Sequence, residues 1–257
     1  MSGKAAWRGF VLLLALLWCW IRFGWMRLLG PVRVQQRAEW MQFCGRVVLA
    51  SLGIHFRIEG PLPVGPTLIV ANHLSYLDIA ICSAALPCAF VAKEEIASWP
   101  AFGLMARLGG TIFVDRSSRL SAWDTAESMG LRMAHGVPVL FFPEGTSTDG
   151  SEVLRFHSTL FAPSIEAGLA VTPAAIFYEP AGSDLVESDL CWFGDDLFFP
   201  HLLRVLGVQG FTAVVRFGQP ERFPDRRTAA WRSHDAIERM REFFEEDATS
   251  CPELVSQ

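Results

Sequence analysis

A histidine and an aspartate five residues apart are the side chains of this sequence best suited to chemistry. They lie in the segment Asn72-His73-Leu-Ser-Tyr-Leu-Asp78, directly after the apolar run Thr67–Ala71. We expect that run to form a buried strand and a helix to begin at Ser75. Both side chains would then lie where a sheet strand ends, which is where α/β proteins usually place their sites.

The same spacing supports two interpretations of Asp78. Ser75 and Asp78 fit a helix capping box in which Asp replaces the usual Glu, and His73 would then be an incidental turn residue. Alternatively, His73 folds back from just before the helix toward Asp78 in the first turn. A carboxylate there fixes the imidazole tautomer and stabilises the imidazolium, so that His73 can take a proton from an alcohol as a general base.

Three later segments accompany this motif in order along the chain. One predicted strand follows Gly109-Gly110 and ends in Asp115-Arg116, another passes into the turn Phe142-Pro143-Glu144-Gly145-Thr146-Ser147, and a third opens with Val171-Thr172-Pro173-Ala174. With the His73 motif, they resemble the four motifs of the 1-acylglycerol-3-phosphate acyltransferase family, over about Leu52 to Phe217. The segment Trp192–Leu202 and the apolar amino terminus are similar to those of bacterial members.

The resemblance implies an activity and a role for each motif. His73 would be the general base on the acceptor hydroxyl, and Asp78 would orient it. The acceptor then attacks a fatty acyl thioester, on coenzyme A or acyl carrier protein, without a covalent acyl-enzyme. The residues matched to acceptor binding are Arg116, Glu144, Gly145 and Thr146. Further candidates for contact with the acceptor or the acyl donor are Asn72, Ser75 and Arg155.

The chemistry of the acceptor-binding residues suits a phosphate. The guanidinium of Arg116 can donate to a phosphate through two N–H groups at once. Glu144 would repel a phosphate, so we expect it to hold Arg116 or a backbone amide while Gly145 and Thr146 present N–H groups. The alternatives are a surface ion pair of Arg116 with a nearby aspartate and a simple turn at Glu144.

One departure from the family pattern bears on the substrate. Where the family often shows a basic stretch, this chain reads Arg155-Phe-His-Ser-Thr-Leu160, without lysine or glycine. The expected acceptor is 1-acylglycerol-3-phosphate, giving phosphatidic acid. A lyso-ornithine lipid or another lipid without phosphate is the alternative within enzymes. A catalytically silent, membrane lipid-binding protein is the alternative from another class, and a serine or cysteine hydrolase is disfavoured because the chain has no GxSxG motif.

Alternating strand and helix patterns must position these residues. The predicted strands are Phe56–Glu59, Thr67–Ala71, Cys88–Ala92, Thr111–Val114, Val137–Phe142, Leu169–Phe177 and Val214–Phe217. The predicted helices are Val34–Leu52, one from Ser75, Ser118–His135 and Arg226–Glu246, the last with Ile237, Met240, Phe243 and Phe244 inward. The alternation predicts an α/β fold with a mixed, mostly parallel sheet covered by helices.

The amino terminus predicts a membrane anchor. Gly9–Ile21 is uncharged and about 20 Å long as a helix, short of the roughly 30 Å hydrocarbon core. Extension to Leu29 would span that core only if Arg22 and Arg27 reached back to the headgroups. We therefore favour a monotopic or half-inserted anchor over a spanning helix, with a buried core helix as the remaining alternative. Residues 1–50 would be membrane-associated helices and residues 51–257 the catalytic domain.

Composition limits the partners. The 257 residues are 51% hydrophobic, and 22 basic against 27 acidic side chains give a net charge of −5. Six of the basic residues precede Glu39, where no acidic residue occurs, so the rest carries 16 basic against 27 acidic groups. This pattern disfavours nucleic acid and favours anionic lipid. We expect membrane association, at the cytoplasmic face of a bacterial inner membrane.

The six cysteines predict neither disulfides nor a metal site. They show no CxxC pair and no regular spacing, which indicates reduced, mostly buried thiols. No HExxH motif or paired histidine occurs either. We therefore expect no metal and no cofactor beyond the acyl thioester, which is a substrate.

Overall fold

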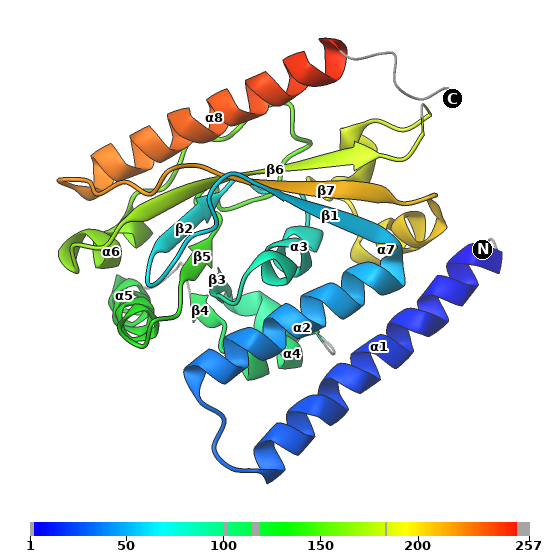
Figure 1. Ribbon diagram of the computed structural model, residues 1–257, viewed down its shortest axis with the longest axis horizontal. Helices are drawn as coiled ribbons and strands as arrows, with labels where there is room; N and C mark the ends of the chain where they lie inside the picture. The colour runs from blue at the N-terminus through cyan, green and yellow to red at the C-terminus, as the bar shows by residue number, and fades with distance from the viewer. Residues whose placement is uncertain (1–2, 100–101, 115–118, 183, 251–257) are drawn as a thin grey trace.

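A mixed seven-stranded sheet forms the centre of the protein in a computed structural model, which describes residues 3–99, 102–114, 119–182 and 184–250 (Figure 1). The strands are β1 (Ile54–Glu59), β2 (Leu68–Ala71), β3 (Ala89–Lys93), β4 (Ile112–Val114), β5 (Val139–Phe141), β6 (Val171–Pro180) and β7 (Phe211–Phe217). Their order is β1-β7-β6-β2-β5-β3-β4. Only β6 and β7 pair antiparallel among them, which confirms the predicted mixed, mostly parallel sheet.

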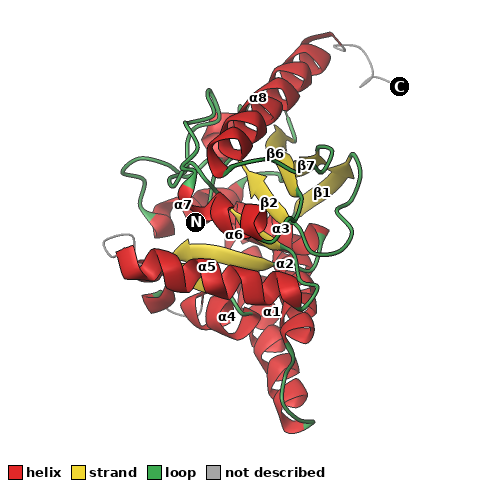
Figure 2. Ribbon diagram, turned by 90° about the vertical axis from the view of Figure 1, so that its left-hand side faces the viewer, coloured by secondary structure: helices red, strands yellow, loops and turns green. Residues whose placement is uncertain are grey.

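Helices cover both faces of the sheet. They are α1 (Gly3–Leu28), α2 (Val34–Leu52), α3 (Leu77–Ala85), α4 (Phe102–Gly109), α5 (Arg119–Ala134), α6 (Ala162–Glu166), α7 (Phe198–Gly207) and α8 (Arg226–Ser250), with 3₁₀ turns η1 (Glu94–Ser98), η2 (Thr159–Phe161) and η3 (Glu187–Leu190). In the turned view, α8 lies on one side of the sheet, and α1 and α2 lie on the other (Figure 2).

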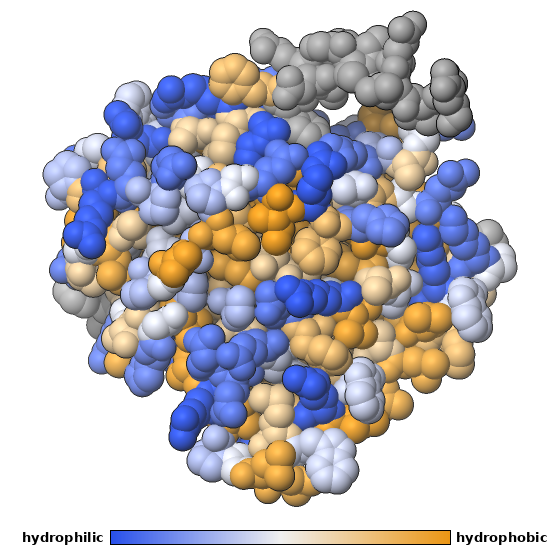
Figure 3. All heavy atoms as spheres, in the orientation of Figure 1, coloured by the Kyte–Doolittle hydropathy of each residue, from blue (hydrophilic) through white to orange (hydrophobic). Residues whose placement is uncertain are grey.

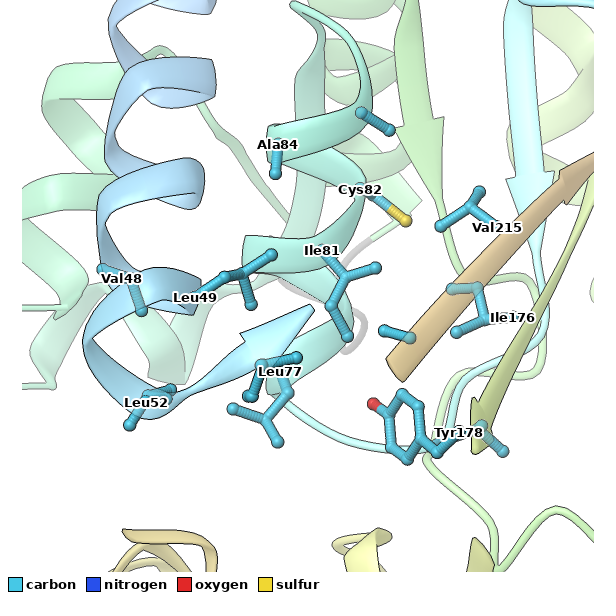
Figure 4. Close-up of a cluster of buried hydrophobic side chains, with 14 of the residues drawn as sticks. Val48, Leu49, Leu52, Leu77, Ile81, Cys82, Ala84, Ile176, Tyr178 and Val215 are labelled. Carbon is cyan, nitrogen blue, oxygen red and sulfur yellow. The ribbon is translucent and has the colours of Figure 1, made fainter. Parts of the chain in front are cut away.

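The two faces have separate hydrophobic cores. Alternate side chains of β6 point to opposite faces: Ile176 and Tyr178 pack toward α2 and α3, while Ala175 and Phe177 pack toward α5 and α8. Figure 4 shows the first of these cores, in which Ile81 of α3 lies between Leu49 of α2 and Ile176 of β6. Because both faces are covered, the inner strands are continuous apolar runs, as is usual for buried parallel sheets.

The first helix packs against the body but leaves much of its apolar surface outside. Leu12 and Cys19 are buried, whereas Leu13 and Trp18 are more than half exposed. Apolar side chains gather along α1 in the space-filling view (Figure 3). The helix continues through Arg22 without a break. Judged by length and composition alone, it could cross a membrane. Its exposed apolar side favours membrane association.

An arginine holds α1 to the end of α7. The Arg8 guanidinium donates to the carbonyl oxygens of Val208 at 2.7 Å and Gln209 at 3.3 Å. These carbonyls belong to the end of α7, where the helix dipole favours a cation. The contact fixes α1 alongside the body, antiparallel to α2 (Figure 1).

The carboxy-terminal helix departs from its predicted burial. Ile237 is buried as expected, but the prediction for Phe243 is wrong, since its side chain is 60% exposed. The Phe244 side chain lies outside the described residues. In place of Phe243, α8 buries Arg241, which is 5% exposed.

The thiols agree with the prediction as far as they are described. The buried free cysteines are Cys19, Cys44, Cys82, Cys88 and Cys191, and Cys251 lies outside the described residues.

Gly45 sets the spacing of α2 and α3, and its replacement by alanine should destabilise the fold. A Cβ there would lie 2.5 Å from the Ala80 carbonyl oxygen and 2.8 Å from the Ala84 nitrogen, both backbone atoms that cannot turn aside. We expect Gly45→Ala to lower the free energy of unfolding by about 1–3 kcal/mol, measured by denaturant titration in detergent. Gly130→Ala in α5 is the matched control, because nothing lies within 4 Å of its Cβ position. Equal stability of the two variants would contradict this account.

Candidate active site

The predicted chemical residues meet at the carboxyl edge of the central strands. β2 leads into His73, and its neighbour β5 leads into Glu144. β3 pairs with β5 on the far side and ends at Lys93. Because these strands are parallel, the segments that follow them emerge at the same edge of the sheet.

His73 and Asp78 form a hydrogen-bonded pair. His73 Nδ1 lies 2.8 Å from Asp78 Oδ2. Since an ionised carboxylate only accepts, we assign the proton to Nδ1, which leaves Nε2 as the imidazole atom able to accept a proton. The ring stacks on Phe142, with centroids 4.1 Å apart and planes 12° apart. The orientation of the imidazole is therefore fixed on two sides.

The Asp78 carboxylate has no exposed surface and accepts four hydrogen bonds. Oδ2 accepts from the backbone N–H groups of Leu74 at 2.7 Å and Ser75 at 3.0 Å, in addition to His73. Oδ1 accepts from the hydroxyl of Tyr178. One oxygen of Asp78 therefore contacts both the backbone before the helix and the imidazole, and the general-base role of His73 stays a prediction. The helix begins at Leu77, two residues later than predicted.

Asn72 and Ser75 face the protein backbone. Asn72 Oδ1 accepts from the N–H of Ile176 at 2.7 Å, and its Nδ2 donates to the carbonyl oxygen of the same residue at 3.1 Å. Ser75 Oγ accepts from the N–H of Leu77 at 3.3 Å. Both side chains are buried. Asn72 therefore ties β2 to β6, and Ser75 contacts the first residue of α3, while their expected substrate contacts stay predictions.

Glu144 holds backbone amides, one of the two arrangements expected for it. Its Oε1 accepts from the N–H of His73 and its Oε2 from the N–H of Leu154, both at 2.8 Å. Burial raises the pKa of this carboxyl to about 7, against the opposing effect of these two hydrogen bonds. The side chain therefore fixes the backbone of His73 and of the loop after Glu144.

A cavity of about 440 Å³ opens beside His73. Its wall includes Gly145 and Thr146, whose acceptor-binding role stays a prediction, together with Lys93 and Glu95. Arg155 is exposed and does not line this cavity, and Arg116 lies outside the described residues. Within the described part of the chain, no group of three or more histidine, cysteine or acidic side chains could hold a metal ion.

An apolar cavity of about 120 Å³ adjoins the first. Tyr76, Ile79, Ile96 and Trp99 line both. The apolar cavity extends between α1, α2 and α4, where Leu12, Met41 and Met105 form part of its wall. The polar and apolar cavities therefore share a boundary formed by these four side chains, and His73 lines the polar cavity.

Two tyrosines of the site were not predicted. The Tyr76 hydroxyl lies 3.0 Å from His201 Nδ1, and His201 Nε2 lies 3.2 Å from the carbonyl oxygen of Leu190. Burial lowers the pKa of His201, so the neutral ring accepts from Tyr76 and donates to that carbonyl. Tyr178 could have been found from its place in an otherwise apolar strand, because a buried hydroxyl requires a partner.

Comparisons with known proteins agree with this geometry. The family model described as Acyltransferase matches residues 53–177. The chain is 39% identical to the lyso-ornithine lipid O-acyltransferase of Pseudomonas aeruginosa, over 74% of this chain and 71% of that protein. It is also 39% identical to the 1-acyl-sn-glycerol-3-phosphate acyltransferase of Neisseria meningitidis, over 67% and 68%.

The fold matches a solved member of the same group. The crystal structure of the 1-acyl-sn-glycerophosphate acyltransferase PlsC from Thermotoga maritima superposes with a TM-score of 0.65 at 19% identity, covering 93% of this chain and 98% of that one. The family model and these relatives define an acyltransferase of a lipid-biosynthesis family. The chain belongs to the acyltransferase family that contains the lyso-ornithine lipid and 1-acylglycerol-3-phosphate O-acyltransferases.

The carboxyl group of Glu144 should make the free energy of unfolding depend on pH. Its pKa is raised from about 4.5 to about 7 on folding, so between these values the folded state binds a proton that the unfolded state has released. The stabilisation is present below about pH 4.5 and is lost as pH rises through about 7, by up to about 3 kcal/mol.

Denaturant titrations of wild type and Glu144→Gln across this range test the effect. The amide cannot accept from both backbone N–H groups, so the variant should be less stable by about 1–3 kcal/mol at low pH and should show a shallower pH slope. Glu94→Gln, at an exposed carboxyl outside the cavity, should keep the wild-type slope. Parallel slopes for all three proteins would contradict the assignment.

Proposed function

We propose that this protein transfers a fatty acyl chain from an acyl thioester to the free hydroxyl of a lysolipid, with His73 as the general base. The observation that carries the proposal is the His73–Asp78 pair in the wall of a cavity that joins polar and apolar compartments. An amphiphile needs both compartments at once. A binding protein has no requirement for an imidazole held in one tautomer by a buried carboxylate.

The proposed reaction needs only groups that substrates and protein supply. Nε2 of His73 takes the hydroxyl proton of the acceptor while the oxygen bonds to the thioester carbonyl carbon. The carbon–sulfur bond then breaks, and the proton passes to the departing thiolate. Asp78 stabilises the imidazolium between these steps. Alignment of the two substrates supplies further rate enhancement, and no cofactor takes part.

We assign the apolar cavity to an acyl chain. Its wall is almost entirely apolar, and it meets the polar cavity at Tyr76 and Trp99. A chain lying there would have its reacting end near His73. The carrier of the donor chain is acyl-CoA or acyl carrier protein.

For the acceptor, the motif pattern favours 1-acylglycerol-3-phosphate. Lyso-ornithine lipid is the second candidate, supported by the relative from Pseudomonas aeruginosa and by the charges of the cavity wall. Lys93 and Glu95 both line the cavity. An ornithine head group carries an ammonium and a carboxylate, for which a wall of two opposite charges is suited, whereas a phosphate would be repelled by Glu95.

We further propose a monotopic attachment at the cytoplasmic face of a bacterial inner membrane. The Arg8 contacts keep α1 on the body, which supports an orientation along the membrane surface over one across it. The basic amino terminus suits anionic lipid, and acyl thioesters are made in the cytoplasm.

A transfer assay with purified protein in detergent tests the reaction. Labelled acyl-CoA and acyl carrier protein would be offered with 1-acylglycerol-3-phosphate and lyso-ornithine lipid in parallel. We expect His73→Ala to lower the rate by about 10²–10⁴, because the general base is lost. His157→Ala, at an exposed histidine outside the cavity, should retain the wild-type rate. Undiminished transfer by His73→Ala would refute the proposed mechanism, and binding of lysolipid without any transfer would favour the silent lipid-binding protein.

The acceptor assignment has its own test in Glu95→Gln. If the ornithine ammonium contacts this carboxylate, the variant should raise KM for lyso-ornithine lipid about threefold to tenfold, as expected for a partly exposed ion pair. KM for 1-acylglycerol-3-phosphate should fall or stay constant. Glu94→Gln is the matched control, because Glu94 does not line the cavity. An equal change for both acceptors would argue against charge recognition by Glu95.

A further inference from the structure

Among the hydrogen-bond donors to Asp78 in the described part of the chain, the hydroxyl of Tyr178 is the one that comes from a distant segment. The other donors belong to the segment His73–Ser75, immediately before α3. Tyr178 instead extends from β6, with its hydroxyl turned toward the start of α3 (Figure 4). Burial and the neighbouring Asp78 raise the pKa of Tyr178 well above its usual range, so the hydroxyl keeps its proton and acts as a donor.

Tyr178 is itself held in place by a partly buried ion pair. Its backbone N–H donates to Glu187 Oε1 at 2.8 Å, and Glu187 Oε2 accepts from Arg241 Nη2 at 2.6 Å. The tyrosine ring packs on Phe211, with centroids 5.0 Å apart. The position of the hydroxyl is therefore fixed by the sheet on one side and by η3 and α8 on the other.

Arg241 connects α8 to the segments that hold the catalytic motif. Besides Glu187, its guanidinium donates to the carbonyl oxygens of Ile176 at 2.6 Å and Gly150 at 2.7 Å. Ile176 is the residue whose amide and carbonyl are both bound by Asn72. The turn before Gly150 reaches His73, since the N–H of Thr148 donates to the His73 carbonyl oxygen at 2.9 Å.

We propose that Tyr178 is a positioning residue for the His73–Asp78 pair, and that Arg241 keeps Tyr178 in place through Glu187. This inference rests on the proposed acyl transfer. Tyr178 touches neither substrate and acts through Asp78. Its hydroxyl donates to Oδ1, so Oδ2 stays directed at the imidazole.

The hydroxyl also sets how readily the pair releases a proton. Asp78 Oδ1 is buried, and within the described residues the donor that it would lose without Tyr178 is that hydroxyl. An uncompensated buried oxygen favours the protonated state of the pair. A smaller share of His73 would then be free to accept a proton, and a higher pH would restore the active form.

Several other charged or titratable groups face the His73–Asp78 pair, and they are the same in wild type and in Tyr178→Phe. They are Cys82 on α3, Glu144 after β5, Glu187 and Cys191 at η3, Arg241 on α8, and Lys93 and Glu95 across the cavity. Comparison of wild type with a single-hydroxyl deletion therefore isolates the contribution of Tyr178.

The test is the pH–rate profile of Tyr178→Phe. This change removes the hydroxyl and keeps the ring in the core. We expect kcat at pH 7 to fall by about tenfold to a hundredfold, the range for one hydrogen bond to a charged group, with KM for both substrates unchanged. The midpoint of the acid limb should move up by about one to two pH units, and activity should recover at higher pH. Arg239→Gln, at an exposed site on α8, should match wild type.

A second readout does not depend on turnover. The neutral imidazole of His73 reacts with diethyl pyrocarbonate, and peptide mass spectrometry distinguishes it from the other histidines. The midpoint of this reaction should rise in Tyr178→Phe and stay constant in Arg239→Gln. An unchanged midpoint would overturn the inference even if acyl transfer is observed. Absence of transfer by wild type would refute the proposed function and leave this measurement valid.

A test of the role of Arg241 requires a variant that still folds. Arg241→Met combined with Glu187→Gln removes both charges and leaves neither unpaired, while the glutamine oxygen can still accept from the Tyr178 N–H. If Arg241 positions the site, the double variant should show native thermal unfolding, a lowered kcat and an unchanged KM. Wild-type kcat and an unchanged pH midpoint would assign Arg241 to stability alone and overturn its part of the proposal.

Discussion

The buried carboxylate of Asp78 is the group on which both the fold and the chemistry depend. A charge without exposed surface costs several kcal/mol unless donors replace its water, and here four donors do so. Three come from the chain leaving β2 and one from β6. The arrangement therefore exists only when β2 and β6 are paired in register and α3 begins at Leu77. The pairing of β2 with β6 that forms the sheet therefore also brings together the groups that orient His73.

Much of this architecture follows from the sequence. The apolar runs at β2, β5 and β6 predict buried strands, and the His73 motif predicts the pair at their carboxyl edge. What the sequence does not reveal depends on partners distant along the chain. Arg241 lies among charged residues of α8, and its burial is decided by Glu187 and Gly150. Pro200 makes the start of α7 hard to predict from the sequence, although proline is tolerated in the first turn of a helix.

The apolar cavity connects the first helix to the candidate site. Leu12 of α1 is a wall residue of the apolar cavity, and the opposite side of the same helix is exposed and apolar. The helix therefore serves the lipid surface and the cavity together. Under the proposed function, a lysolipid would move from the bilayer to His73 without passing through bulk water. That route avoids exposing the acyl chain to water, which would cost about 0.8 kcal/mol for each methylene group.

The close contact at Gly45 has a consequence for how such an enzyme can diversify. The spacing of α2 and α3 is limited by backbone atoms, so the width of the apolar cavity is a fixed property of the scaffold. Its remaining dimensions depend on side chains such as Met41, Val48 and Met105. None of these side chains is a hydrogen-bond partner in the network behind Asp78, which draws on β6, η3 and α8. Chain-length preference can thus drift through single substitutions in the wall of this cavity, while the residues that hydrogen-bond to Asp78 are inherited unchanged.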